Sequence, residues 1–138
     1  NVRSMYFAET GSRLGGHDDV PETLFMPFTE PVSEEDDEEF NRWYQEVHLP
    51  EVLDVPGFSA ASRYKETGMN MTGRPWPINF PYLALYELGD GTKEAFDNAM
   101  KELRRRISEG DRMEISETLG SDKITQVYSR ITDRIAAT

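Results

Sequence analysis

The sequence predicts an α+β protein whose elements follow the order strand, helix, strand, strand, helix, strand. Two segments repeat apolar residues at the 3.6-residue spacing of an amphipathic helix, and four short apolar runs are bounded by Gly and Pro. The chain has 138 residues, of which 37% are hydrophobic, and this is enough for one core. We therefore expect an N-terminal arm at residues 1–22 and a single domain at residues 23–138.

The first strand is expected at residues 23–31, which are apolar on both alternating sets of positions. Pro27 favours a sheet edge or a bulge, because proline cannot donate a ladder hydrogen bond. A helix should follow, with Ser33 as its N-cap and the acidic residues 34–39 in its first turns, where the helix dipole favours negative charge. Its apolar face then comprises Phe40, Trp43, Tyr44 and Val47.

We expect this first helix to end near His48, because Leu49 precedes Pro50 and is therefore disfavoured in the helical region. Pro50 could then open a second short turn. At 100° per residue, His48 lies about 80° from Phe40 and about 40° beyond Tyr44. This spacing predicts that His48 is at the margin of the buried face, in the seam between helix and sheet.

The second half of the domain shows the same alternation of patterns. Residues 58–65 and 81–88 predict two strands, separated by a long loop that is rich in Gly, Pro and Met. Thr92 is the expected N-cap of a second helix, which should end near Gly110. The last strand is expected at residues 124–131. The apolar face of the second helix comprises Phe96, Ala99, Met100, Leu103 and Ile107.

This order of elements is the ferredoxin-like arrangement, a four-stranded antiparallel sheet with two helices on one face. Two helices can cover only one face of the sheet, whereas the strands at residues 23–31 and 81–88 are apolar on both faces. The second face must therefore pack against another surface of similar size. We expect that surface to be a second copy of the chain, so that two sheets pack face to face in a homodimeric α/β barrel.

Charge and composition exclude several classes of protein. The net charge of −11 opposes binding to nucleic acids and to anionic membranes, and the acids around residues 104–106 outweigh that basic cluster. The absence of cysteine excludes disulfides and thiolate nucleophiles. No apolar run approaches the roughly 20 residues of a membrane span, and no signal peptide is visible. We therefore expect a cytoplasmic protein without nucleic-acid or membrane partners.

His48 is the main candidate for catalysis, with Tyr44 and Arg63 beside it. A partly shielded imidazole can be neutral at physiological pH and exchange a proton with a substrate. Tyr44, one turn earlier, could orient the imidazole or donate to a substrate oxygen, and Arg63 could bind an anion or an enolate. Glu51 could be the carboxylate partner of His48. The alternative is a structural histidine that donates to a carbonyl or balances the helix dipole.

The loop at residues 66–80 could close over an apolar small molecule, because long loops in small domains are often lids. Trp43 could contribute a ring to the site or could belong to the core. The expected substrate-binding residues are Phe28, Trp43, Tyr64, Met69, Met71 and Trp76.

A metal site is not expected. His17, Asp18 and Asp19 would have to converge from the arm on His48 and Glu51, and none of these pairs has the i, i+4 spacing of ligands on a helix. The sequence also lacks a Gly-rich phosphate loop between a strand and a helix. We therefore expect neither a metal nor a cofactor.

The stretch "FTEPVSEEDDEEFNRWYQEVHLPEVLDVPGFSAASRYK" resembles the EthD-like branch of the dimeric α/β-barrel superfamily. Such proteins carry an acidic helix start followed by Phe-Asn-x-Trp-Tyr, Val-His-Leu-Pro, Val-Pro-Gly-Phe and Arg-Tyr. These motifs correspond here to residues 40–44, 47–50, 55–58 and 63–64. In that family the helix histidine faces a pocket between sheet and helices, and the resemblance implies this role for His48.

The resemblance is less specific for the reaction, because its members include muconolactone-type isomerases, polyketide cyclases and cofactor-free monooxygenases. Our first hypothesis is a cofactor-independent enzyme of catabolic or secondary metabolism, of isomerase, lyase or cyclase type. It would act on a small apolar or aromatic carbonyl compound by proton transfer through His48, with Tyr44 and Arg63 stabilising an oxyanion. The alternatives are a non-catalytic dimeric binding protein for a hydrophobic molecule, a cofactor-free monooxygenase and a heme-binding protein.

Overall fold

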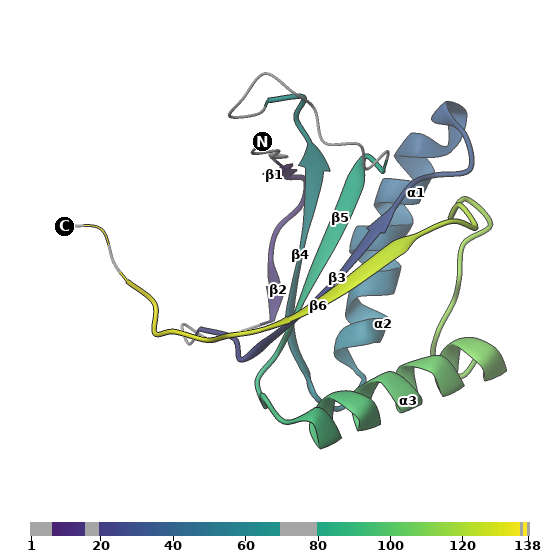
Figure 1. Cartoon of the computed structure of the whole chain (residues 1–138). Coiled ribbons are helices and arrows are strands. Elements are labelled where there is room, and N and C mark those ends of the chain that lie inside the picture. The colour runs from purple at the N-terminus through teal and green to yellow at the C-terminus, as the bar shows by residue number, and fades with distance from the viewer. Residues whose placement is uncertain (1–6, 16–19, 70–79, 136, 138) are drawn as a thin grey trace.

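The computed structural model of the chain describes residues 7–15, 20–69, 80–135 and 137. It has an α+β fold, as expected, in which an antiparallel sheet packs against helices (Figure 1). The strands are β1 (Phe7–Glu9), β2 (Leu14–Gly15), β3 (Thr23–Thr29), β4 (Phe58–Glu66), β5 (Tyr82–Leu88) and β6 (Ile124–Ser129).

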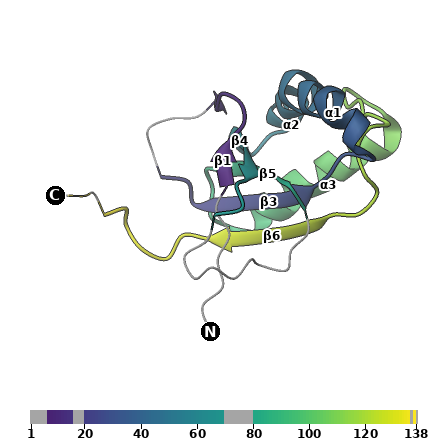
Figure 2. The same ribbon diagram turned by 90° about the horizontal axis from the view of Figure 1, so that it is seen from above.

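The sheet has the order β1-β4-β5-β3-β6, with β2 also paired to β4, and all of these pairings are antiparallel. Figure 2 shows β6 beside β3 at one end of this order. The expectation of four strands is therefore wrong in number, because the sheet has six. The two additional strands, β1 and β2, come from the arm at residues 1–22 and pair with the outer edge of β4. Their pairing satisfies backbone groups that an uncovered edge strand would expose.

The first helix begins with a 3-10 turn and contains a π-helical turn, and a second helix follows β5. Ser33 has an extended backbone before this start, but its hydroxyl donates to the carboxylate of Asp36 at 2.9 Å rather than capping a backbone N–H. None of the helices in the described ranges is long and apolar enough to cross a membrane. The helical elements are η1 (Glu34–Asp36), α1 (Asp37–Trp43), η2 (Tyr44–His48), α2 (Leu49–Leu53) and α3 (Lys93–Glu109).

Pro50 lies at the start of a second short helical segment, α2, as expected, but the expectation that the helix ends near His48 is wrong, because Leu49 keeps a helical φ of −58° and ψ of −47°. The backbone N–H of Leu49 bonds to the carbonyl of Tyr44, five residues back, so η2 is a wide π turn. Pro50 lacks an N–H, and in a regular helix its ring would clash with a carbonyl one turn earlier. In the wide turn just before Pro50, the backbone bonds five residues back instead of four, so the proline does not follow a regular helical turn. Pro50 itself lies in the first turn of α2. The helix therefore continues to Leu53.

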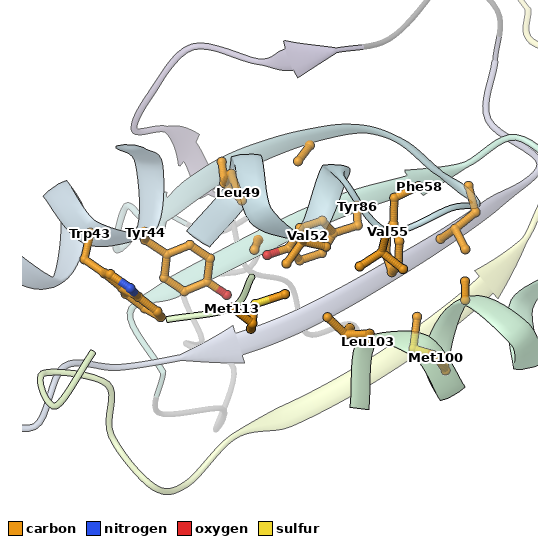
Figure 3. Packing of buried hydrophobic residues seen from close by; sticks show 14 of the residues in the cluster. Trp43, Tyr44, Leu49, Val52, Val55, Phe58, Tyr86, Met100, Leu103 and Met113 are labelled. Atoms are coloured by element: carbon orange, nitrogen blue, oxygen red, sulfur yellow. The ribbon is translucent and has the colours of Figure 1, made fainter. Parts of the chain in front are cut away.

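Both helices pack on the same face of the sheet and form the core with it (Figure 3). Val52 of α2 and Leu103 of α3 meet Phe58 and Tyr86 of the sheet in one buried cluster. On the opposite face, Phe28 is 7% exposed. The ring of Phe7 contacts it edge to face, with 5.8 Å between the ring centroids. The arm therefore covers part of the second face.

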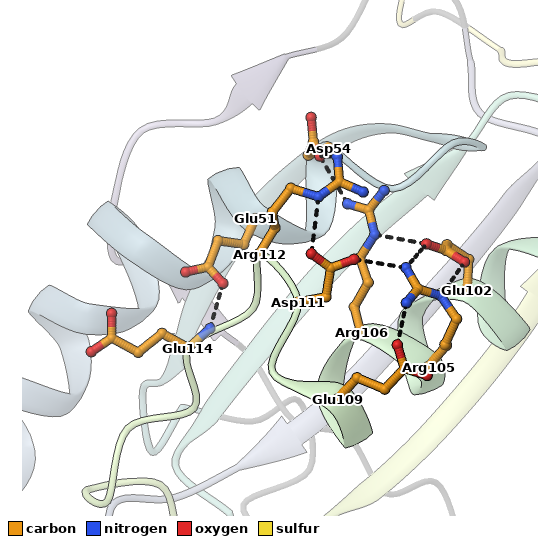
Figure 4. Close-up of polar contacts among 9 residues, drawn as sticks. All are labelled: Glu51, Asp54, Glu102, Arg105, Arg106, Glu109, Asp111, Arg112 and Glu114. Carbon is orange, nitrogen blue, oxygen red and sulfur yellow. Dashed lines mark hydrogen bonds and ion pairs between the residues drawn. The ribbon is translucent and has the colours of Figure 1, made fainter.

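Charged side chains join the end of α2 to the end of α3 (Figure 4). The buried guanidinium of Arg106 donates to Asp54 at 2.8 Å and to Glu102 at 2.9 Å. Arg105 also bonds to Glu102, and it reaches Asp111 at 2.9 Å. Arg105 pairs with carboxylates of α3 and of the segment just after it, whereas the ion pair of Arg106 with Asp54 fixes α3 relative to α2.

The predicted ends of α3 are confirmed. The hydroxyl of Thr92 accepts a hydrogen bond from the N–H of Ala95 at 3.2 Å. Gly110 follows the helix with a φ of 66°, the left-handed conformation that favours glycine.

Replacing Gly110 by Ala should lower the free energy of unfolding by about 1 kcal/mol, because a side chain disfavours this left-handed conformation. The added methyl group would meet no atom within 4 Å, so a steric clash would not contribute. Urea unfolding measures the effect. Gly89→Ala is the matched control, because its methyl group also has open space and its φ lies outside the left-handed region. Equal stability of the two variants would contradict this account.

Candidate functional site

A cavity of about 160 Å³ lies between the helices and the sheet face that they cover. The polar residues that line it include Thr29 on β3, Tyr44 and His48 on η2, Tyr86 on β5, and Lys123 just before β6. An apolar cavity with a few convergent polar groups is the usual form of a small-molecule site. The other lining residues are Phe25, Pro27, Val52, Leu103, Ile107, Ile115, Leu119 and Thr125.

The wide turn of η2 places His48 against two aromatic rings. Its imidazole stacks on Trp43, with 4.7 Å between the ring centroids, and meets Tyr44 edge to face at 5.0 Å. The contact with Tyr44 agrees with the expected neighbourhood of the two residues. The stacking on Trp43 follows from the π turn, which brings residues five apart onto one side of the helix.

The imidazole of His48 is uncharged at neutral pH. Burial, followed by the positive charges of Arg63 and Lys123, lowers the pKa of His48 to about 4. Its Nδ1 atom is buried and has no hydrogen-bond partner among the described residues. His48 therefore presents a neutral ring to the cavity, with no described carboxylate bonded to Nδ1.

Arg63 lies behind Tyr44 and does not itself line the cavity. Its side chain is almost completely buried, and its guanidinium carbon is 4.2 Å from the centre of the Tyr44 ring. This is a cation–π contact at short range. Nε and Nη2 of Arg63 have no hydrogen-bond partner in the described part of the chain. Burial lowers the pKa of Arg63, and the tyrosines around it oppose that change.

One hydrogen-bonded chain links Arg63 to a carboxylate near the surface. Nη1 of Arg63 donates to Oδ1 of Asn41 at 2.9 Å. The amide nitrogen of Asn41 donates to the hydroxyl of Tyr82 at 2.9 Å, and Tyr82 donates to Asp37 at 2.6 Å. Asn41 also donates to Oδ2 of Asp37 at 3.3 Å, so it orients the guanidinium and separates it from the negative charge of Asp37.

Three buried polar atoms that lack partners among the described residues belong to residues lining the cavity. They are Oγ1 of Thr29, Nδ1 of His48 and the hydroxyl of Tyr86. The hydroxyl of Tyr44 lies near those of Thr29 and Tyr86 without giving them hydrogen bonds of acceptable geometry. Buried polar groups without partners are rare because each one costs free energy. Their convergence indicates a site for a molecule that bears oxygen.

The tyrosines of the cavity remain protonated at neutral pH. Burial raises the pKa of Tyr44, although the charge of Arg63 opposes it. Burial also raises the pKa of Tyr86, well above its usual value. Both phenols can therefore donate a hydrogen bond to an oxygen atom inside the cavity.

The structure brings together only some of the residues that the sequence suggested. Trp43 is buried in the core, and its indole N–H donates to the carbonyl of Glu114 at 2.8 Å. Phe28 comes directly before Thr29 on β3, and Tyr64 comes directly after Arg63 on β4. Thr29 and Arg63 point to the helix-covered face, so the side chains of Phe28 and Tyr64 point to the opposite face.

The loop residues do not add to the described site. Met69 is 63% exposed and does not line the cavity. Met71 and Trp76 lie outside the described residues, as do His17, Asp18 and Asp19 of the arm. Within the ranges that the structure describes, no group of three His, Cys, Asp or Glu side chains could hold a metal ion.

The suggestion that Glu51 partners His48 is wrong. Oε2 of Glu51 accepts a hydrogen bond from the backbone N–H of Glu114 at 2.6 Å, so its carboxylate holds the segment after α3 (Figure 4). Sequence reasoning also missed Thr29, Tyr86 and Lys123 as lining residues. Strand alternation could have placed Thr29 and Tyr86 on the helix-covered face, because Thr29 shares that face with Phe25 and Phe25 pairs with Tyr86. Alternation could not show that a cavity lies there.

No protein-family model and no curated protein matches the sequence.

The neutral state of His48 predicts a specific loss of stability in mild acid. Its folded pKa of about 4 lies below the ordinary value of 6.5, so below pH 6.5 the unfolded chain binds more protons than the folded one. Stability should therefore fall as the pH drops from about 6.5 towards 4. His48→Phe keeps a ring against Trp43 and removes this titration. Between pH 7.5 and 5, the natural chain should lose about 2 kcal/mol more stability than this variant in urea unfolding. Equal losses would contradict a buried neutral imidazole.

Proposed function

We propose that this chain is an EthD-like protein with a ferredoxin-like domain, and that it acts as a cofactor-independent enzyme of isomerase, lyase or cyclase type. The substrate would be a small apolar or aromatic carbonyl compound, and His48 would transfer the proton. The convergence of unpartnered polar atoms of Thr29, His48 and Tyr86 in one largely apolar cavity is the observation that carries this proposal.

In this reaction the neutral imidazole of His48 takes a proton from the carbon next to the carbonyl group. The electron pair of that C–H bond moves to the carbonyl oxygen, and an enolate forms. Tyr44 and Tyr86 donate hydrogen bonds to the enolate oxygen, and the charge of Arg63 behind Tyr44 strengthens the first of these donors. Return of the proton to another carbon completes an isomerisation. In an elimination, the enolate electrons re-form the carbonyl and make a carbon–carbon double bond, while the β-substituent departs with its bonding electron pair and takes the proton from His48.

The low pKa of His48 makes it a weak base in the empty cavity. The situation changes when the enolate forms, because a negative charge then lies beside the imidazolium in a site that excludes water. Proton transfer and oxyanion formation are thus coupled. Such coupling favours substrates whose oxygen reaches both tyrosines.

His48→Ala tests the assignment of the base. In D2O, the natural protein should exchange the α-protons of at least one member of a panel of monocyclic ketones, followed by NMR. The variant should fold normally and exchange the same compound at least about a hundredfold more slowly. Lys101→Met, at an exposed position of α3, is the control and should retain the full rate.

The two outcomes of this experiment separate the proposed enzyme from its alternative. Undiminished exchange in His48→Ala would remove His48 from the mechanism. If the natural protein binds a member of the panel and exchanges none of its protons, the chain is a binding protein for small hydrophobic molecules. In that case the same polar atoms would only orient the ligand.

We also propose that two copies associate through the face and edge of the sheet around β6. This strand is at the end of the sheet and has no partner on its outer side among the described residues. Two exposed apolar side chains of β6, Ile124 at 37% and Tyr128 at 53%, point to the face opposite the helices, because these residues pair with Phe28 and Leu24. An exposed apolar patch next to an unpaired strand edge supports protein association.

Light scattering after size exclusion tests this association. The natural chain should be a dimer at micromolar concentration, and Tyr128→Lys should shift it to a monomer, because a charge at this position would be buried in the contact. Met69→Lys is the matched control, because Met69 is also an exposed apolar residue but lies away from β6. A monomeric natural chain would remove the dimer from the proposal.

A further inference from the structure

Lys123 is the one charged residue among the described side chains that line the cavity. It is exposed, and it has no ion pair with a described carboxylate although the chain carries a net charge of −11. Its charge is close enough to His48 to lower the pKa of the imidazole. An unpaired ammonium group is therefore available where the cavity meets solvent.

The position of Lys123 gives the cavity two chemically different ends. The orphan atoms of Thr29, His48 and Tyr86 are buried, so they mark the inner end. Ile107 and Ile115 are each 42% exposed and, with Lys123, mark the mouth. A ligand would meet hydroxyl groups inside, apolar walls around its body and a cation where it emerges.

The volume restricts the body of the ligand to one ring. A cavity of about 150 Å³ with apolar walls is large enough for benzene, and this cavity measures about 160 Å³. A fused two-ring compound would require the walls to move apart. The described cavity thus fits a single six-membered ring that carries small substituents.

We propose that the ligand is a monocyclic carboxylate: one ring with a hydroxyl or carbonyl oxygen at the inner end and a carboxylate that pairs with Lys123 at the mouth. The role of the inner oxygen in a reaction rests on the function proposed above, whereas the recognition of the carboxylate by Lys123 does not. The ion pair selects acids over uncharged compounds of the same shape. It also orients the ring so that its oxygen points towards Tyr44, Tyr86 and His48.

Isothermal titration calorimetry at low salt tests the recognition of the carboxylate directly. The probes are 4-hydroxybenzoate, the uncharged 4-hydroxybenzamide and the two-ring 6-hydroxy-2-naphthoate. The natural chain should bind 4-hydroxybenzoate at least about fivefold more tightly than the amide, the value of a partly exposed ion pair of about 1 kcal/mol. It should also bind the benzoate more tightly than the naphthoate, whose second ring would require the walls of the cavity to move apart. Lys123→Met should abolish the preference for the acid over the amide, and Lys101→Met should keep it.

A charge reversal gives a second and independent measurement. Lys123→Glu should reject 4-hydroxybenzoate and bind 4-(aminomethyl)phenol more tightly than the natural chain does. The proposal is overturned if 4-hydroxybenzoate does not bind, if acid and amide bind equally to the natural chain, or if Lys123→Met keeps the preference. Binding of the naphthoate as tightly as the benzoate would overturn the restriction to one ring.

The outcome is distinguishable from that of the proposed enzyme. Titration reports binding only, so a preference for the acid without any proton exchange would leave the carboxylate site in place and reject the enzyme. Proton exchange of neutral ketones through His48, without a preference for acids, would do the reverse.

Discussion

The hydrogen bond from the N–H of Leu49 to the carbonyl of Tyr44 determines where the imidazole of His48 lies. It belongs to the wide turn just before Pro50, a residue that fits poorly inside a regular helix. Through this turn His48 stacks on Trp43, contacts Tyr44 and faces the cavity. The two parts of the first helix remain continuous, so both pack on the sheet. The position of the site is thus a consequence of backbone geometry rather than of a loop.

Several buried polar atoms in the interior of the protein have no hydrogen-bond partner among the described residues. Arg63 keeps a buried guanidinium with one described hydrogen bond and three aromatic rings around it. Around the cavity, Thr29, Tyr86 and His48 each have a polar atom without a described partner. Such groups lower stability in the empty protein, and a ligand that satisfies them stabilises the folded state by mass action. The polar atoms of the site therefore lower the stability of the empty folded protein.

Sequence reasoning succeeded where the signal was local. Thr92 and Gly110 delimit α3 because a cap depends on residues a few positions apart. It placed His48 beside Tyr44 at the seam between helix and sheet, but it missed the π turn and the stacking of His48 on Trp43, because a wheel of 100° per residue assumes a regular helix. It also failed for Glu51, whose partner at Glu114 depends on the tertiary arrangement.

The four long strands were predicted, and their alternating patterns indicate two faces. Alternation does not say what covers each face. It therefore could not predict the cavity, the pairing of β1 and β2 with β4, or the place of Lys123. Tyr86 illustrates the difficulty, because a tyrosine in an apolar strand is equally compatible with a core residue and with a donor to a ligand.

The two edges of the sheet are unequal, and this limits how copies of the chain can assemble. The arm covers the outer edge of β4 through β1 and β2, whereas the outer edge of β6 has no described partner. A sheet with two open edges can add copies at both ends and grow into a fibre. The edge formed by β1 and β2 is only three and two residues long and offers few backbone groups to another strand, whereas β6 is six residues long. A twofold contact between two β6 strands would use the longer edge of each copy and leave only the short strands of the arm at the two ends of the assembly. Growth beyond two copies would then depend on these short strands.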